Sequence, residues 1–184
     1  MKITVTGGSG FLGSHVADEL SKRGHKVKIF DRKKSMWKRP DQKIFIGDIL
    51  NYKDLESAIK GADAVFHFAA LADIDEALKK PIGTAKINIS GTVLALEMSY
   101  KYKIKRFVHA SSIYVNSNEG GFYRCSKKAA EDYVEEYHRV FGLNYTVLRF
   151  GSLYGERSDN TNGLTNIINS AIANNKISYM GGKS

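Results

Sequence analysis

The glycine-rich stretch near the N-terminus constrains the fold of this chain more than any other part of the sequence. Residues 3–5 (Ile-Thr-Val) predict a short buried strand, and residues 7–13 predict a tight turn that runs directly into a helix. Glycine allows the backbone to come close to an anion, because no side chain stands between the two. The N-terminus of the following helix then supplies N–H groups and a partial positive charge. This order of elements predicts a phosphate-binding site.

Three glycines of the turn have separate expected roles. Gly7 takes the unusual turn conformation, Gly10 leaves room for phosphates, and Gly13 lets the helix pack tightly on its strand. A glycine pattern alone is weak evidence, so the flanking strand and helix carry much of the argument. The helix is expected to be amphipathic, with an apolar face made by Phe11, Leu12, Val16 and Leu20.

The second expected strand ends in an acidic residue. Residues 27–30 are followed by Asp31, which lies about twenty positions after the glycines. A carboxylate there accepts hydrogen bonds from both hydroxyls of an adenosine ribose, so the pattern predicts a dinucleotide site. The same carboxylate repels a 2′-phosphate and favours NAD, while the neighbouring Arg32 leaves NADP as the less favoured alternative.

Composition excludes several classes of protein. The sequence is 42% hydrophobic and 26% charged, which is typical of a soluble globular domain, and it holds no apolar run of membrane-spanning length. The N-terminus has no signal-peptide layout, and the single cysteine excludes an internal disulfide, so we expect a reducing cytoplasm. The five scattered histidines and one cysteine have no metal-ligand spacing, which predicts no metal site.

The net charge of +9 raises the question of nucleic-acid binding. The positive residues form small clusters spread along the sequence, and such clusters are mostly solvated surface. Nucleic acid is therefore an unlikely partner, and a basic surface also suits an anionic small substrate.

Strand and helix patterns alternate along the chain, which predicts an α/β fold with a doubly wound parallel sheet flanked by helices. The expected strands are residues 3–5, 27–31, 43–48, 64–68, 106–110, 145–148 and 176–180. After the first helix, further helices are expected at residues 55–59 (with Asn51 as cap), 86–100, 123–141 and 162–174. Ligands of such sheets bind beyond the carboxyl ends of the strands. The residues at or near those ends are Gly7, Asp31, Asp48, Ala69, Ser112 and Arg149.

Tyr123 and Lys127 carry the most informative chemistry. At a spacing of four on a helix, both side chains share one face. An ammonium group near a phenol favours the phenolate and lowers the phenol pKa, which makes the tyrosine usable as a base. Ser112, at the end of the preceding strand, can hydrogen-bond the same substrate oxygen. Alone, such a pair is usually only helix surface.

Together these motifs resemble the extended short-chain dehydrogenase/reductase family of NAD-dependent sugar-nucleotide epimerases and dehydratases, over nearly the whole chain. The matching segments are Thr6–Gly13, Asp31, Asp48–Ile49, His67–Ala70, Asn88–Thr92, the set Ser112, Tyr123 and Lys127, and Arg149–Gly155. The resemblance implies a Rossmann-type NAD-binding domain over residues 1–184 and a C-terminal substrate lobe that is absent from this chain.

The resemblance also implies the residues of the site. The catalytic residues would be Ser112, Tyr123 and Lys127. The cofactor-binding residues would be Gly7, Gly10, Phe11, Leu12, Gly13, Asp31, Arg32, Asp48, Ile49, Phe68, Ala69, Ala70, Asn88, Tyr123 and Lys127. Tyr123 would remove a proton from a sugar hydroxyl while a hydride passes to the nicotinamide, and reduction of the keto sugar from its other face would complete an epimerisation.

Three departures from the family pattern affect the reaction. Ile113 and Tyr114 follow Ser112 where the dehydratases and decarboxylases carry an acidic residue, so those reactions lose their expected acid. Only ten residues separate Ser112 from Tyr123, where relatives have a longer covering loop. Ser152 stands where the family usually has asparagine. An alternative is therefore a non-catalytic NAD(P)-binding sensor or scaffold module.

Other residues have simpler interpretations. His67 is expected to be structural, Asp73 and Asp75 to be loop or helix-start carboxylates, and Cys125 to be a small packed residue. The resemblance implies a homodimer that pairs residues 86–100 and 123–141, whose tyrosines suit an interface.

Overall fold

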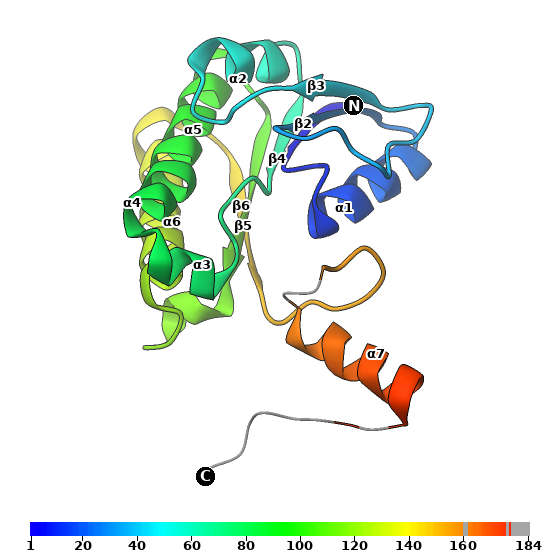
Figure 1. Ribbon diagram of the computed structural model, residues 1–184. Helices are drawn as coiled ribbons and strands as arrows, with labels where there is room; N and C mark the ends of the chain where they lie inside the picture. The colour runs from blue at the N-terminus through cyan, green and yellow to red at the C-terminus, as the bar shows by residue number, and fades with distance from the viewer. Residues whose placement is uncertain (160–161, 176, 178–184) are drawn as a thin grey trace. The chain divides into compact units, whose positions relative to one another are not determined.

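The computed structural model describes residues 1–159, 162–175 and 177. Six parallel strands form one sheet in the order β3-β2-β1-β4-β5-β6, which confirms the predicted fold class (Figure 1). The strands are β1 (Lys2–Thr6), β2 (Lys26–Asp31), β3 (Lys43–Ile46), β4 (Ala64–His67), β5 (Arg106–Ser112) and β6 (Tyr145–Phe150). The chain runs outward from β1 in both directions, so the strand order switches between β1 and β4, where parallel sheets open a crevice for ligands.

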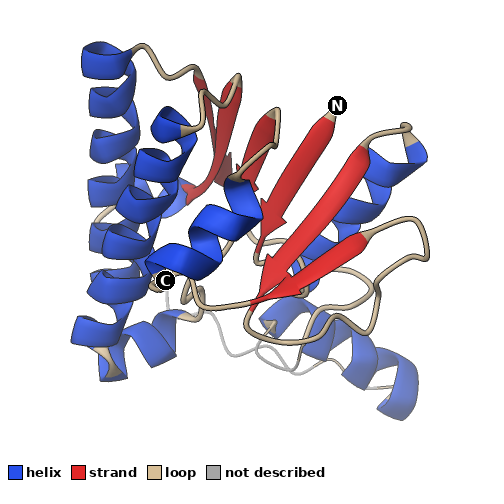
Figure 2. Cartoon of the chain, turned by 90° about the horizontal axis from the view of Figure 1, so that it is seen from above, coloured by secondary structure: helices blue, strands red, loops and turns tan. Residues whose placement is uncertain are grey.

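The helices form layers on the two sides of the sheet. In Figure 2, α1 (Phe11–Lys22) lies on one face, while α2 (Tyr52–Ile59), α5 (Gly91–Lys101) and α6 (Gly121–Phe141) lie on the other. Shorter elements connect them: α3 (Ile74–Lys79), α4 (Pro81–Thr84), the π-helix η1 (Ala85–Ser90) and the 3₁₀-helix η2 (Ile113–Asn116). Among the described residues, no helix is long and apolar enough to cross a bilayer.

Alternation along the strands divides the core in two. Phe30, Val65 and Phe107 belong to the larger cluster, which they form with residues of α2, α5 and α6. Their neighbours Ile29 and Ala64 belong to the smaller cluster, which includes Ala17 of α1. Successive side chains point to opposite faces of a strand, and both faces are apolar here, as expected for a parallel sheet.

Two helices differ from their expected form. The deeply buried residues of α1 are the small Gly13, Ser14, Ala17 and Ser21, not the predicted apolar face. At Gly13 the helix lies too close to the turn for a larger side chain, while Leu20 of the predicted face is partly buried against the smaller core cluster. The expected helix at 86–100 begins instead as the π-helix η1, whose wider turn ends where α5 starts at Gly91.

Strand ends also differ from expectation by a few residues. β5 ends at Ser112, as expected, whereas β6 continues to Phe150, so Arg149 lies within a strand. β3 ends at Ile46, which leaves Asp48 in the following turn. Asn51 caps α2 as predicted, accepting hydrogen bonds from the N–H groups of Lys53 and Asp54.

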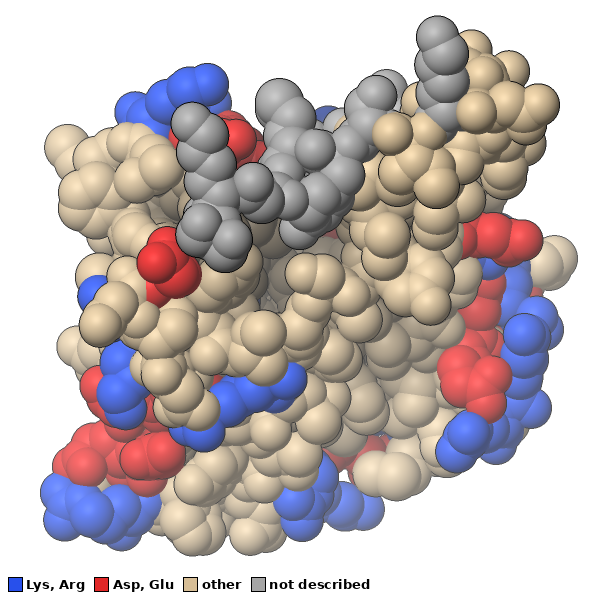
Figure 3. Space-filling model, turned by 90° about the horizontal axis from the view of Figure 1, so that it is seen from below, with Lys and Arg blue, Asp and Glu red and all other residues tan. Residues whose placement is uncertain are grey.

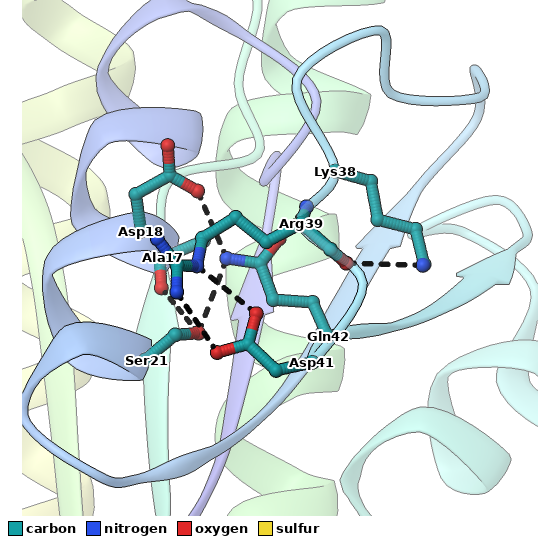
Figure 4. A network of polar contacts seen from close by, with 7 residues as sticks. All are labelled: Ala17, Asp18, Ser21, Lys38, Arg39, Asp41 and Gln42. Atoms are coloured by element: carbon teal, nitrogen blue, oxygen red, sulfur yellow. Dashed lines mark hydrogen bonds and ion pairs between the residues drawn. The ribbon is translucent and has the colours of Figure 1, made fainter.

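A polar network holds the loop between β2 and β3 against α1 (Figure 4). The Gln42 amide donates to Asp18 Oδ1 (2.9 Å) and to Ser21 Oγ (3.1 Å) of α1, and its Oε1 accepts from the Arg39 backbone N–H (3.0 Å). Arg39 in turn pairs with Asp41 through two nitrogens. The loop that follows Asp31 is thereby fixed to the helix that follows the glycine turn.

The chain divides into two compact units, residues 1–151 and 152–184. The first holds the sheet and all the elements above. In the second, the Asn162 side chain caps α7 (Gly163–Asn174) by accepting from the Thr165 N–H (2.9 Å). A hollow of about 330 Å³ lies within this unit, lined by Tyr154, Gly155, Glu156, Arg157, Ser158, Thr165, Ile168 and Asn169. The strand expected at 176–180 falls outside the described residues apart from Ile177.

Candidate functional site

The glycine turn closes against two neighbouring strands. Gly7 has φ = +69°, and its N–H donates to the Phe30 carbonyl (2.8 Å) at the end of β2. A Cβ at Gly7 would stand 2.6 Å from the Ala69 backbone nitrogen. Both the left-handed conformation and the close approach to residue 69 therefore require glycine here. The unusual conformation predicted for Gly7 is confirmed.

The other two glycines shape the start of α1. A Cβ at Gly13 would lie 2.2 Å from the Gly7 carbonyl oxygen, so Gly13 packs the helix against the turn itself, not against the strand as expected. A Cβ at Gly10 would lie 3.4 Å from the same Gly7 oxygen, so this position is less crowded. Gly10 is the N-cap and has no side chain to cap the helix, whose first turn carries no acidic residue. These first N–H groups can therefore be satisfied by a bound anion.

Asp31 lies beside this turn at the end of β2. Its Oδ2 accepts from the Ser9 N–H (3.0 Å) and its Oδ1 from the Lys33 N–H (3.1 Å). The carboxylate is half-buried, so it is oriented by the backbone but keeps free lone pairs for ribose hydroxyls. Arg32 is exposed next to it. Together, the uncapped helix, the glycine cradle and the oriented carboxylate fit a dinucleotide.

The remaining residues expected at the cofactor divide into two groups. Half-buried residues that line the carboxyl edge are Phe11, Leu12, Asp48, Phe68, Ala69 and Ala70. Ile49 is different, because its side chain is 5% exposed and belongs to the larger core cluster, where it packs on Gly91. Its side chain therefore packs in the core, so the expected contact of Ile49 with the cofactor, which stays a prediction, would be made by its backbone. The apolar residue after Asp48 serves to anchor the turn in the core.

The Asn88 side chain is also buried, and its expected contact with the cofactor stays a prediction. Its side chain is 1% exposed, and its amide is engaged by the protein: Oδ1 accepts from the Leu71 N–H (2.7 Å), while Nδ2 donates to the Leu71 carbonyl (2.9 Å) and to Ser126 Oγ (2.9 Å). An amide with these partners ties protein segments together.

Ser112, Tyr123 and Lys127 come together at the ends of β5 and α6. Lys127 is 5% exposed, its ammonium lies 5.8 Å from the centre of the Tyr123 ring, and it donates to the Ala110 carbonyl (2.8 Å). Ser112 is 5% exposed and its hydroxyl accepts from the Tyr114 N–H (3.3 Å). Tyr123 is half-buried in the first turn of α6. The sequence spacing thus places a phenol, an ammonium and a hydroxyl in one group.

The electrostatics differ from the expected ones. Burial raises the pKa of the Tyr123 phenol, and hydrogen bonding with the Ser112 side chain only partly opposes it. Burial also lowers the pKa of Lys127 to about 8, against the opposing effect of the Glu131 carboxylate. The predicted lowering of the phenol pKa by Lys127 is therefore wrong for the protein alone. Desolvation is the largest cause of both shifts, because both groups are largely shielded from water.

Two features of the site were not predicted. Arg149, near the end of β6, forms a bidentate pair with Glu131 of α6. Ser126 bridges Asn88 and the backbone of Tyr123. Glu131 follows Lys127 by four positions on the same helix, and that spacing could have marked Glu131 as a residue near the site. No sequence signal indicates the contact of Ser126 with Asn88, because the two residues are far apart in the sequence.

The simpler interpretations are mostly confirmed. The buried His67 ring contacts the hydroxyls of Thr6 (2.8 Å) and Thr92 (3.0 Å), which is a structural arrangement. Asp73 caps α3 by accepting from the Glu76 N–H. Cys125, however, is exposed and not a packed residue.

The comparisons with known proteins decide the family. The family model described as NAD dependent epimerase/dehydratase matches residues 3–184. The chain belongs to this family. It is 34% identical to a putative UDP-glucose 4-epimerase of Methanocaldococcus jannaschii, covering 85% of this chain and 57% of the relative. It is also 30% identical to a dTDP-D-glucose 4,6-dehydratase of Dictyostelium discoideum, covering 98% of this chain and 50% of that protein.

Solved structures of the epimerase/dehydratase family match the fold closely. A Thermotoga maritima UDP-glucose 4-epimerase with UDP-glucose superposes with a TM-score of 0.85 at 32% identity, over 93% of this chain and 62% of that one. A Thermus thermophilus UDP-glucose 4-epimerase complex with NAD gives 0.84 at 29% identity, over 93% and 61%. The chain therefore spans a little over half the length of these relatives.

Charges at the carboxyl edge are mixed. Figure 3 views the molecule from below, the side on which the strands of Figure 1 end, and Lys and Arg atoms lie near the margin among Asp and Glu atoms. The exposed basic residues seen on this face do not form one continuous patch.

Proposed function

We propose that this chain binds NAD and acts as an epimerase or reductase on a nucleotide sugar. The observation that carries the proposal is the grouping of Ser112, Tyr123 and Lys127 at the same sheet edge as the glycine turn. NAD, when bound, supplies hydride chemistry. Relatives named as UDP-glucose 4-epimerases and a dTDP-glucose dehydratase support the substrate class.

The chain's own residues would move and hold the proton. The Tyr123 phenolate takes the proton of a sugar hydroxyl, and the Ser112 hydroxyl orients that oxygen. Lys127 has two N–H groups left after its bond to Ala110, and these can hold the nicotinamide ribose. With a pKa of about 8, Lys127 is mostly charged at neutral pH, so it donates its hydrogen bonds as an ammonium. Loss of hydride and proton leaves a keto sugar, which is then reduced on its other face.

The residues after Ser112 favour epimerisation or simple reduction over dehydration. Ile113 and Tyr114 form the first part of the 3₁₀-helix η2, and neither side chain carries a carboxylate. A 4,6-dehydratase needs an acid to expel water from the keto sugar. The expected products are therefore an inverted or a reduced sugar.

A Tyr123→Phe variant tests the proposal with Tyr133→Phe as its control. Tyr133 lies on the same helix and is 45% exposed, outside the catalytic group. Over a panel of nucleotide sugars, we expect turnover in the wild type, its loss in Tyr123→Phe, and NAD affinity within about threefold in all three proteins. A Tyr123→Phe protein that keeps the wild-type rate would show that another group is the base.

The second candidate is a non-catalytic NAD(P)-binding module. It is supported by the short connection from Ser112 to Tyr123, which turns through the two left-handed glycines Gly120 and Gly121. Such a connection provides little chain to cover a substrate. NAD binding without turnover on the whole panel would favour this alternative.

A homodimer through α5 and α6 is part of the proposal. Tyr100 of α5 stacks on Phe141 of α6 at 4.5 Å, and both are about half exposed. Tyr133 extends this aromatic surface along α6, and the substitution Tyr100→Glu should shift sedimentation from dimer to monomer. A single, concentration-independent monomer in the wild type would overturn this part.

A reducing cytoplasm, proposed as the site of action, suits the exposed Cys125 thiol.

A further inference from the structure

Asn88 connects two segments at the carboxyl edge of the sheet. It lies on the π-helix η1 and holds both the N–H and the carbonyl of Leu71, just after the half-buried segment 68–70. Its own carbonyl accepts from Thr92 Oγ1 (2.7 Å), which also contacts the His67 ring of β4. The Asn88 side chain is thus fixed from two directions inside the protein.

Ser126 extends this connection to α6. Its hydroxyl accepts from Asn88 Nδ2 (2.9 Å) and donates to the Tyr123 carbonyl (2.8 Å), and the residue is 2% exposed. One buried hydroxyl therefore links the first turn of α6 to the amide that holds Leu71. Both of its bonds are made away from water, where geometry is well defined.

The start of α6 has no side-chain cap. Its N-cap is Gly120, which makes no side-chain capping bond, and Gly120 and Gly121 both have positive φ. Glycines permit many backbone conformations, so the helix entry is not fixed by its own sequence. Tyr123 sits two residues after this entry.

We propose that Ser126, through Asn88, is a positioning residue that holds Tyr123 in register with segment 68–71 at the cofactor edge. This inference rests on the proposed function, in which Tyr123 is the base. Hydride and proton transfer depend steeply on the positions of the reacting groups, whereas NAD binding is spread over the glycine turn, Asp31 and the sheet edge. Loss of the Ser126 hydroxyl should therefore affect turnover far more than affinity.

Ser126→Ala tests the proposal, and Ser99→Ala is its matched control. Ser99 is also a fully buried helical serine that donates to a carbonyl of its own helix (Ala95, 2.7 Å), but it lies on α5, outside the link from Asn88 through Ser126 to Tyr123. We expect Ser126→Ala to lower kcat about tenfold, with KM and the NAD Kd within about threefold of wild type. Ser99→Ala should keep the wild-type kcat. Equal kcat in the two variants, or failure of Ser126→Ala alone to fold, would overturn the positioning role.

Amide hydrogen exchange makes the test independent of the activity. The Leu71 N–H bonds to Asn88, so its exchange reports whether the amide is still held. In Ser126→Ala, Leu71 and the first turn of α6 should exchange about tenfold faster than in Ser99→Ala. If the wild type turns over no sugar, the proposed function fails. The exchange comparison still tests whether Ser126 links Asn88 to the first turn of α6. Equal exchange in both variants would refute it.

Discussion

Arg149 and Glu131 join the last strand of the sheet to α6 through two parallel hydrogen bonds. Arg149 Nε donates to Glu131 Oε1 (3.0 Å) and a terminal nitrogen donates to Oε2 (2.7 Å). The Glu131 side chain is fully buried, while Arg149 is 43% exposed. Burial alone would raise the pKa of Glu131, but the Arg149 guanidinium outweighs it and holds that pKa below its ordinary value. The pair thus keeps a carboxylate charged one turn after Lys127.

Arg149→Met should destabilise the protein, because it leaves the buried carboxylate without its partner. We expect the free energy of unfolding at pH 7 to fall by about 3 kcal/mol. Lys128→Met removes the exposed pair with Asp132 on the same helix and should cost less than about 1 kcal/mol. Urea unfolding measures both. A double variant with Glu131→Leu and Arg149→Met should recover most of the loss, and failure to recover would argue against an electrostatic origin.

Gly13→Ala should disrupt the glycine turn. The added Cβ would meet the Gly7 carbonyl at 2.2 Å, and a backbone atom cannot move aside as a flexible side chain does. We expect NAD binding to be lost and the free energy of unfolding to fall by about 3 kcal/mol. Gly83→Ala is the control in another helix, where the nearest atom is 3.7 Å away, and it should be neutral or stabilising by up to about 1 kcal/mol. Calorimetric titration with NAD and thermal unfolding measure both variants. Equal NAD affinity and equal stability in Gly13→Ala and Gly83→Ala would contradict the importance of the contact between Gly13 and Gly7.

The parts of the fold that could be predicted from sequence are those set by local chemistry. Gly7 needs its left-handed conformation in any strand-to-helix turn of this shape, and Asp31 follows a strand whose alternation is plain in the sequence. The burial of the Ile49 and Asn88 side chains was not predicted, because burial depends on which helix packs over a residue. No local pattern shows that α5 covers Ile49, or that Ser126 meets Asn88 from a position 38 residues away.

Lys127→Met should separate stability from function. Burial disfavours the ammonium, and the folded-state pKa of about 8 lies below the ordinary value of 10.5. The folded state therefore binds the proton less well, so stability is highest above pH 10.5, falls as pH drops toward 8, and stays reduced below 8. We expect the variant to be more stable than wild type at pH 7 by about 1–2 kcal/mol and to have no turnover. Unfolding at pH 7 that gives a less stable variant would contradict this reading of Lys127.

The two stacked histidines of the core predict sensitivity to acid. His67 and His109 lie 5.8 Å apart, each 1% exposed, and burial is the main cause that lowers the pKa of His67 to about 3 and that of His109 well below its ordinary value. Within the described residues neither ring nitrogen of His109 has a hydrogen-bond partner, so protonation there gains no compensating contact.

Because both folded-state pKa values are lowered, the unfolded chain binds more protons below about pH 6.5. The stability that these residues contribute is fully present above that pH and is lost as pH falls below 6.5, for His67 down to its folded-state pKa of about 3. Each histidine should reduce the folding equilibrium constant by up to about tenfold per pH unit across this window. Urea unfolding at pH 5, 6, 7 and 8, in wild type and in a His109→Phe variant, measures the slope. His109→Phe should show a shallower decline below pH 6.5, and an unchanged slope would mean that His109 takes up its proton without unfolding.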